Sequence, residues 1–211
     1  MSLLELPPEL IVHIASFLHP SAVVDFALTS RACFVCGGDA LAHQKDNAKR
    51  YRVISDIKPL TIPLLMRTIY SDPDVAWYIR SFEFWGTRLN FTQWTKYRLN
   101  DFEYDDTWLV PAVDEDVNNE LPGTKLPEKL DSDFWTEPEC CYFRDYLDSR
   151  SLNPSQKDAS AMFEKIMQGH DEVLKAMLLA HCPRLESLKF VMDEEGVSYV
   201  VETRFQHTRH S

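Results

Sequence analysis

Residues 3–20 read LLELPPELIVHIASFLHP and predict the first helix of the chain. Pro7 and Pro8 suit a first helical turn, where a missing N–H costs nothing, and Glu9 suits the positive end of the helix dipole. Apolar residues then recur at helical spacing and form one stripe, made of Leu10, Ile14, Phe17 and Leu18. The helix should end at His19, because a residue that precedes proline is pushed out of the α region.

Two further short helices are expected before residue 37. Ser21 is expected to cap the second helix, and either Thr29 or Ser30 the third. The apolar face of the second helix would comprise Val24, Ala27 and Leu28. The pair Gly37-Gly38 should break the third helix, and a polar helix should continue over residues 39–52. Three short helices bury too little surface to be stable alone, so either a partner protein or the rest of the chain must cover their apolar residues.

The same residues follow the pattern of a known protein-binding motif. The spacing Leu6-Pro7-x-Glu9-Leu10, Ile14, Phe17-Leu18, Val24 and Ala27-Leu28-Thr29-Ser30-Arg31 resembles an F-box over roughly residues 3–40. F-box proteins dock a Skp-family adaptor, which bridges them to a cullin in an SCF-type ubiquitin ligase, while the rest of the chain selects the substrate. The resemblance implies these docking or bundle-core residues: Leu6, Pro7, Leu10, Ile14, Phe17, Leu18, Val24 and Leu28. Roughly a third of them should face inward, since a small bundle needs some for its own core.

The remainder of the chain alternates helical and extended segments. Residues 59–78 predict one or two short helices, with Asp72 as an N-cap before proline. Strands are expected at residues 79–84 and 185–190, each after a helix, and residues 197–201 form a candidate third strand. The first two share the pattern apolar-x-x-apolar-x-apolar and resemble the strand of a leucine-rich repeat. A solenoid needs roughly three or more stacked repeats, so either the middle of the chain holds degenerate units or the array is abbreviated.

The expected fold is therefore mainly α with a small β component (α+β). Residues 1–50 form the F-box helical bundle, and residues 51–211 form a helix–strand, repeat-like region with an acidic insertion at about residues 86–157. Aromatic residues punctuate that insertion: Trp94, Tyr97, Phe102, Tyr104, Trp108, Phe134, Trp135, Tyr142, Phe143 and Tyr146. Either they pin an irregular insertion to the body, or they form an acidic-aromatic surface for a basic partner.

Charge and cysteine usage limit the classes of function. The formal net charge is −11, and residues 101–150 hold 15 acidic against four basic residues, which accounts for all of it. A nucleic-acid-binding chain needs a basic stretch, and none is visible in the sequence. Five cysteines without framework spacing favour a reducing, intracellular compartment, cytoplasmic or nuclear. No membrane-spanning run or basic signal region is visible, so no membrane association is expected.

No catalytic constellation is visible in the sequence, so an enzyme is not expected, nor is a cofactor. The spacing Cys33-x-x-Cys36 is half of a zinc site, but Cys140-Cys141 is a poor second pair, and Cys33 facing a helical core is the simpler interpretation. The acidic groups Asp105-Asp106 and Asp114-Glu115-Asp116 lack the glycine turn of a calcium loop and are expected to be solvated.

These observations predict a non-enzymatic substrate receptor. Its N-terminal helices would bind a Skp-family adaptor, and through it a cullin, while its C-terminal region holds an unknown protein substrate. Three alternatives stay open: an F-box-like interaction module that acts outside ubiquitin ligases, a truncated product without a target, and an enzyme that uses the acidic middle segment with a divalent ion.

Overall fold

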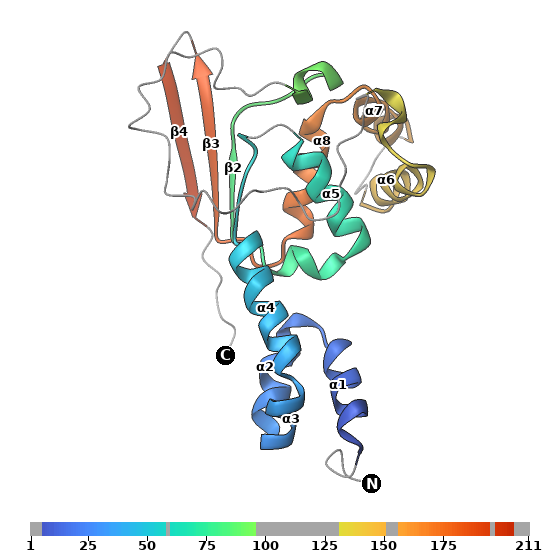
Figure 1. Cartoon of the computed structure of the whole chain (residues 1–211). Coiled ribbons are helices and arrows are strands. Elements are labelled where there is room, and N and C mark those ends of the chain that lie inside the picture. Colours follow the sequence, from blue (N-terminus) through green and yellow to red (C-terminus); the bar gives the residue numbers. More distant parts are fainter. Residues whose placement is uncertain (1–5, 58–59, 96–130, 151–155, 195–196, 205–211) are drawn as a thin grey trace.

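The structure is a computed structural model that describes residues 6–57, 60–95, 131–150, 156–194 and 197–204. Helices dominate and one small sheet accompanies them, which confirms the expected fold class, mainly α with a small β component (α+β). A lobe built from the first helices extends away from a body in which the sheet lies beside the later helices (Figure 1). In the described ranges, every helix is too short or too polar to cross a lipid bilayer.

The extending lobe, called here the bundle, comprises α1 (Pro8–Ser16), α2 (Pro20–Thr29), α3 (Arg31–Cys36) and α4 (Gly38–Tyr51). Pro8 and Pro20 each stand at the first position of a helix, where proline is well tolerated. Ser30 caps α3, since its Oγ accepts a hydrogen bond of 3.1 Å from the backbone N–H of Cys33. Gly37 separates α3 from α4, so the glycine pair ends the third helix as predicted.

The cap of α2 differs from the prediction. His19, not Ser21, is the N-cap, and its Nδ1 accepts a hydrogen bond of 3.2 Å from the backbone N–H of Ser21. The prediction was wrong because Pro20 already has the φ of a helix, which makes the preceding residue the cap. The imidazole therefore fixes the turn between α1 and α2.

The body contains one four-stranded sheet with strand order β1-β2-β3-β4. Its strands are β1 (Val53–Ser55), β2 (Ser81–Phe84), β3 (Ser187–Glu194) and β4 (Val197–Arg204). The first three strands are parallel, whereas β4 pairs antiparallel with β3. The candidate third strand thus exists, but it forms a hairpin and does not extend the parallel array. Strand β1 was not predicted.

The two predicted strands lie side by side in the register that their sequence patterns indicate. Ser81 pairs with Ser187, Phe82 with Leu188 and Phe84 with Phe190. The Ser187 hydroxyl donates to the Ser81 hydroxyl at 2.7 Å, across 106 positions of sequence. The recurring apolar pattern therefore marks strands that share one sheet.

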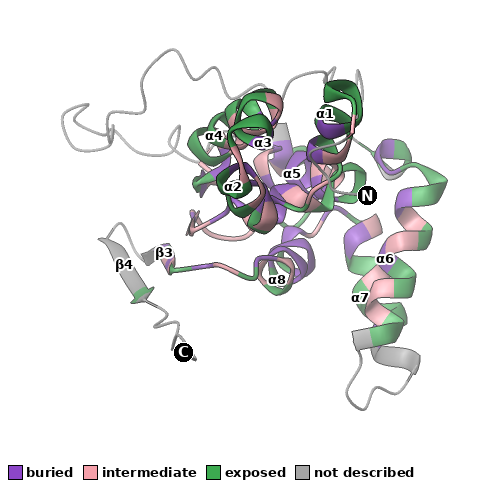
Figure 2. Ribbon diagram, turned by 90° about the horizontal axis from the view of Figure 1, so that it is seen from below, coloured by how far each residue is buried: buried purple, intermediate pink, exposed green. Residues whose placement is uncertain are grey.

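Helices link these strands and enclose the core. Between β1 and β2 run α5 (Thr61–Ser71) and the 3-10 helix η2 (Pro73–Trp77); between β2 and β3 run η3 (Phe91–Thr95), η5 (Ser132–Phe134), α6 (Glu137–Arg150), α7 (Gln156–Met167) and α8 (Asp171–His181). Buried side chains of α5, β2 and α8 form one core cluster, including Leu65, Met66, Phe82, Phe84, Leu174 and Leu178. Figure 2 shows α5 and α8 largely buried, whereas the bundle helices are largely exposed.

The described parts of the expected acidic insertion belong to this body. Trp94, Trp135 and Phe143 are buried in the core cluster, in agreement with the interpretation that aromatics pin the segment. Pro138 lies in the first turn of α6, where proline is tolerated. The acidic groups at residues 105–106 and 114–116, and the aromatics from Tyr97 to Trp108, lie outside the described residues.

Candidate protein-docking surface

The eight residues selected for adaptor docking all reach the surface of the bundle. Phe17 and Leu28 are 76% and 77% exposed, and Leu10 and Val24 about half exposed, at 47% and 50%. Pro7 is also exposed, while Leu6, Ile14 and Leu18 are half-buried. About a third of the set thus turns partly inward, and none of the eight is buried.

A different set of residues forms the interior of the bundle. The buried apolar residues are Ile11 and Ala15 of α1, Val23 and Ala27 of α2, and Cys33 of α3. Several of these are small, whereas exposed positions within two residues of them hold larger side chains such as Phe17, Leu28 and Phe34. A bundle with small residues inside and large apolar residues outside has the composition of half an interface.

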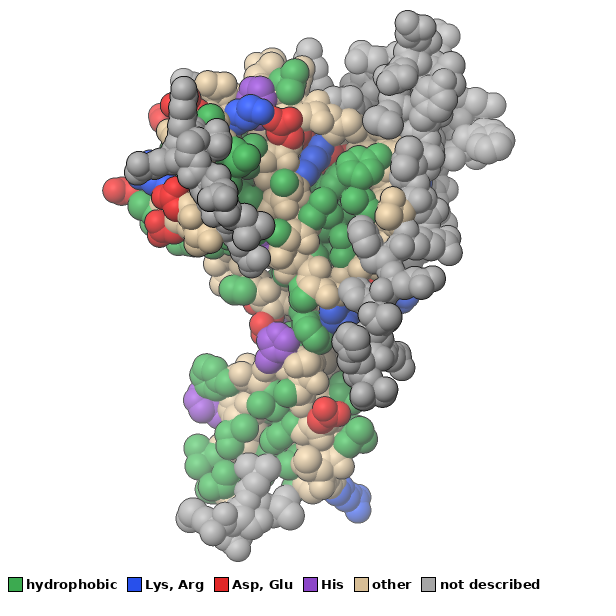
Figure 3. Space-filling model, turned by 180° about the vertical axis from the view of Figure 1, so that it is seen from behind, with side chains coloured by type: hydrophobic (Ala, Val, Ile, Leu, Met, Phe, Trp, Pro, Cys, Tyr) green, Lys and Arg blue, Asp and Glu red, His purple; other side chains and the backbone are tan. Residues whose placement is uncertain are grey.

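The exposed apolar area is wider than the sequence pattern indicated. Val12 of α1 and Phe34 and Val35 of α3 add to it, at 42%, 58% and 69% exposure. We call the whole set the apolar docking surface: Leu10, Val12, Phe17, Val24, Leu28, Phe34 and Val35. Seen from behind, hydrophobic side chains gather over the lobe that the bundle forms (Figure 3). The sequence could have indicated Phe34 and Val35, since both are apolar residues of the predicted third helix.

The contacts that join the bundle to the body lie where α2 begins and α4 ends. The His19 ring meets Trp77 of η2 edge-on at 4.9 Å, and its Nε2 lies 3.8 Å from Asp74. Tyr51, the last residue of α4, is buried in the core cluster of the body. These anchors hold the bundle by one end, and α1–α3 extend away from the sheet (Figure 1).

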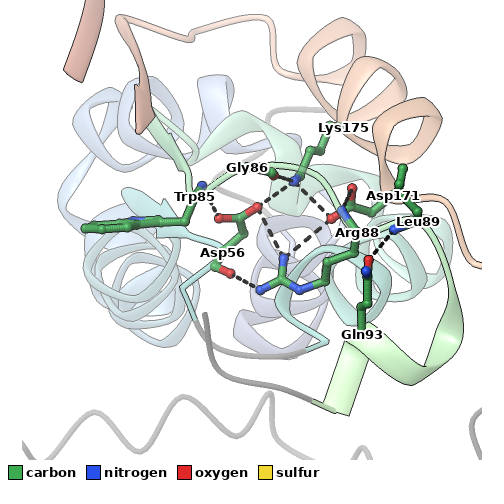
Figure 4. Close-up of polar contacts among 8 residues, drawn as sticks. All are labelled: Asp56, Trp85, Gly86, Arg88, Leu89, Gln93, Asp171 and Lys175. Atoms are coloured by element: carbon green, nitrogen blue, oxygen red, sulfur yellow. Dashed lines mark hydrogen bonds and ion pairs between the residues drawn. The ribbon is translucent and has the colours of Figure 1, made fainter. Parts of the chain in front are cut away.

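A cluster of buried charges is the main feature that the sequence did not indicate. Asp56 follows β1, Arg88 lies in the loop after β2, and Asp171 and Lys175 are one turn apart on α8 (Figure 4). The Lys175 Nζ lies 2.6 Å from Asp56 Oδ2 and 2.9 Å from Asp171 Oδ2. We call these four residues the buried charge network. No local sequence pattern predicts the buried charge network, because most of its members are far apart in the chain.

The network serves the fold. Arg88 donates from Nη2 to the Asp56 carbonyl at 2.7 Å and from its backbone N–H to Asp171 Oδ1 at 2.9 Å. The second Asp56 oxygen, Oδ1, accepts from the Trp85 backbone N–H. All four carboxylate oxygens are thus paired, and the two positive and two negative charges balance. The cluster clamps the loop after β2 onto the start of α8 and offers no unpaired carboxylate to a ligand.

The cysteines do not assemble into a metal centre within the part of the chain that the structure describes. Cys33 is buried in the bundle core, Cys36 is half-buried, and all five cysteines are free thiols. No group of three or more His, Cys, Asp or Glu side chains is placed to hold a metal ion among the described residues. The interpretation of Cys33 as a core residue is confirmed.

Comparisons with known proteins leave the docking surface to be interpreted from its own residues. No protein-family model, curated protein or solved structure matches the chain.

Proposed function

We propose that this protein is the substrate-recognition subunit of an SCF-type cullin ubiquitin ligase. In this proposal the bundle is an F-box that docks a Skp-family adaptor, and the adaptor bridges the chain to a cullin. The body holds a target protein. Catalysis belongs to other subunits, so the chain acts by bringing the target close and orienting it.

One observation carries the proposal: five of the eight residues that match the docking positions of an F-box are exposed, although four of these five are large and apolar, namely Leu10, Phe17, Val24 and Leu28. Leaving such side chains in water forgoes about 1.5–3 kcal/mol each relative to burial. Phe17 and Leu28 are the most exposed large apolar residues of the described chain. A partner protein that covers them would recover that free energy, and the anchoring of the bundle by one end leaves room for it.

The body supports the second half of the proposal. Its three parallel strands, joined by helical connections, are similar in arrangement to a short leucine-rich-repeat array, with β4 closing one edge as an antiparallel strand. A strand that adds antiparallel to the last parallel strand ends such an array, as a terminal cap does in repeat proteins. A short array suits a receptor that grips a small segment of its target.

Co-purification with a Skp-family adaptor tests the proposal. We expect the tagged chain to retain the adaptor, and Phe17→Asp with Leu28→Asp to abolish retention, because each carboxylate would be buried unpaired in the interface. Both side chains are exposed in the free chain, so the variant should fold, as circular dichroism would show. Leu89→Asp with Met162→Asp is the control, since these large apolar residues are about half exposed and lie on the body.

Two results would decide against the proposal. Equal adaptor recovery by wild type and the Phe17/Leu28 variant would contradict docking through the apolar surface. Recovery of the adaptor without a cullin would instead favour an F-box-like module that acts outside ubiquitin ligases.

A further inference from the structure

A groove of about 850 Å³ runs between the bundle and the body, separate from the outer faces of α1 and α3. One wall is the face of α4 that carries Leu41, Gln44, Lys45 and Ala48, together with the start of α2. The opposite wall is the edge of the sheet where the parallel strands begin, with Trp77 and Tyr78 beside it. Val24 lies on the rim that the groove shares with the apolar docking surface.

The fold brings three arginines to that edge from distant parts of the chain. Arg52 directly precedes β1, Arg80 directly precedes β2, and Arg184 lies just before β3. The Arg80 backbone N–H donates to the Arg52 carbonyl at 2.9 Å, and the Arg80 Nη1 donates to the Arg184 carbonyl at 3.2 Å. Parallel pairing therefore aligns the three guanidinium groups along one side of the groove, and Lys45 faces them from α4.

Positive charge in this groove is poorly compensated. Among the described residues that line it, four are cationic and one, Glu186, is anionic, a local net charge of +3 in a chain of −11. Glu186 is more than half exposed and lies 3.6 Å from Arg80, a distance and exposure at which ion pairs contribute little. Burial lowers the pKa of Arg80, and the charges of Arg184 and Arg52 lower it further, whereas Glu186 raises it. Repulsion among like charges is relieved when an anion binds between them.

The groove also offers apolar and aromatic contacts between its charges. The Arg184 guanidinium lies over the Trp77 ring at 4.8 Å, which fixes its plane and presents its N–H donors along the edge. Leu41, Ala48 and Val24 line the facing wall. A nucleic acid is the less suitable occupant, because the net charge of −11 on the chain repels a long polyanion. A short acidic peptide interacts mainly with the positive charges of the groove, since salt screens the more distant negative charges.

We propose that this groove binds a short acidic peptide segment of another protein, whose carboxylate or phosphate groups are held by Lys45, Arg52, Arg80 and Arg184. Apolar side chains of the same segment would lie against Trp77 and the α4 wall. The groove would thereby select targets by negative charge, and of the residues that line it only Val24 also belongs to the apolar docking surface.

Fluorescence anisotropy on the purified full chain, without any adaptor, tests this proposal separately from the proposed function. Three labelled peptides of about ten residues would alternate apolar positions with glutamate, phosphoserine or glutamine. We expect the glutamate or the phosphoserine peptide to bind at least about tenfold more tightly than the glutamine peptide, and to weaken as salt rises. The tighter of the two anionic peptides identifies carboxylate or phosphate as the preferred group.

Two double variants make the test specific. Lys45→Gln with Arg52→Gln should weaken the anionic peptide about tenfold or more, since both side chains are exposed and line the groove. Arg31→Gln with Lys49→Gln removes the same charge from exposed bundle positions outside the groove and should leave affinity within about twofold. Equal weakening by both variants, equal affinity for the anionic and glutamine peptides, or tighter binding of a single-stranded oligonucleotide of the same charge would overturn the proposal.

Discussion

Arg67 of α5 and Glu139 of α6 form a two-point ion pair, with Nε–Oε1 and Nη2–Oε2 distances of 2.5 and 3.2 Å. The same carboxylate accepts hydrogen bonds from the backbone N–H and the hydroxyl of Thr136, the residue that directly precedes α6. The Arg67 guanidinium also lies over the Phe134 ring at 4.4 Å. One arginine thus fixes the segment before α6 and the first turn of that helix onto α5.

This ion pair predicts an acid-sensitive element of stability. Burial would raise the pKa of Glu139, but hydrogen bonds from Arg67 and Thr136 outweigh burial and leave the pKa below its ordinary value. A depressed pKa in the folded state stabilises the protein above the unfolded pKa of about 4.3, and the contribution is lost as the pH falls through the folded pKa. We expect Glu139→Gln to lower the free energy of unfolding at neutral pH by roughly 2 kcal/mol.

Thermal unfolding between neutral and acid pH checks this prediction. The difference between wild type and Glu139→Gln should shrink as the pH falls below about 4, because the wild-type carboxylate is then protonated as well. Glu164→Gln is the matched control, since Glu164 is exposed on α7. A difference that stays constant down to the acid limit would show that the charge of Glu139 does not matter.

The buried charge network should be far more sensitive than a surface ion pair. Lys175→Met leaves two buried carboxylates, Asp56 and Asp171, with only the more distant Arg88 guanidinium between them, at 3.5 and 3.4 Å, and should cost about 3–5 kcal/mol in urea unfolding. Lys165, one helix away, pairs with Glu172, and both side chains are nearly half exposed. Lys165→Met should therefore cost less than about 1 kcal/mol. Similar losses in the two variants would contradict the interpretation of the network as a clamp.

Local chemistry made several features of the fold predictable. Three of these features depend only on residues a few positions apart, so the sequence pattern predicts them directly: proline at the first helical position, the Ser30 cap and the Gly37-Gly38 break. The register of β2 and β3 was predictable because strands that pack against the same core repeat one apolar pattern, here in Ile79–Phe84 and Leu185–Phe190. The three-residue strand β1 was too short to leave such a pattern.

Features that depend on tertiary contacts could not be predicted in the same way. On α1, Ile11 and Ala15 are buried, whereas Leu10 is exposed and Ile14 only half-buried. Periodicity marks both stripes as apolar, and only packing against α3 decides which one is inside. The buried charge network and the arginines of the groove are likewise single residues, brought together from β1, β2 and β3 or α8. These residues lie close together because of the order of the strands in the sheet, and a short stretch of sequence does not reveal that order.

The five cysteines should differ in reactivity according to burial. Burial raises the pKa of the Cys182 thiol to about 12, and it also raises the pKa of Cys140. A thiol reacts as its thiolate, so Cys182 should resist iodoacetamide at mildly alkaline pH until the chain is unfolded. Cys141 is exposed on α6 and should be alkylated first. Peptide mapping by mass spectrometry gives the order, and early modification of Cys182 in the native protein would contradict the packing of α8 against the sheet.

Gly169 and Gly38 provide a matched pair for the last prediction. Gly169 lies two residues after the end of α7 and has a φ of +85°. Its backbone N–H donates to the carbonyl of Ile166 and that of His170 to the carbonyl of Lys165, as in a Schellman motif. A Cβ at Gly169 would lie 2.5 Å from the Phe91 backbone nitrogen, whereas a Cβ at Gly38 would meet nothing within 4 Å. Gly169→Ala therefore combines left-handed strain with a clash against backbone and should destabilise by more than about 2 kcal/mol.

Gly38→Ala should have the opposite sign. Gly38 is the first residue of α4, so alanine there lowers the entropy of the unfolded chain and should stabilise by about 0.5 kcal/mol. Urea unfolding of the two variants beside wild type gives both values. If Gly169→Ala does not destabilise the protein, α7 and η3 must be able to move apart. That result would contradict the interpretation that contacts with α8 fix the loop after β2 to the body.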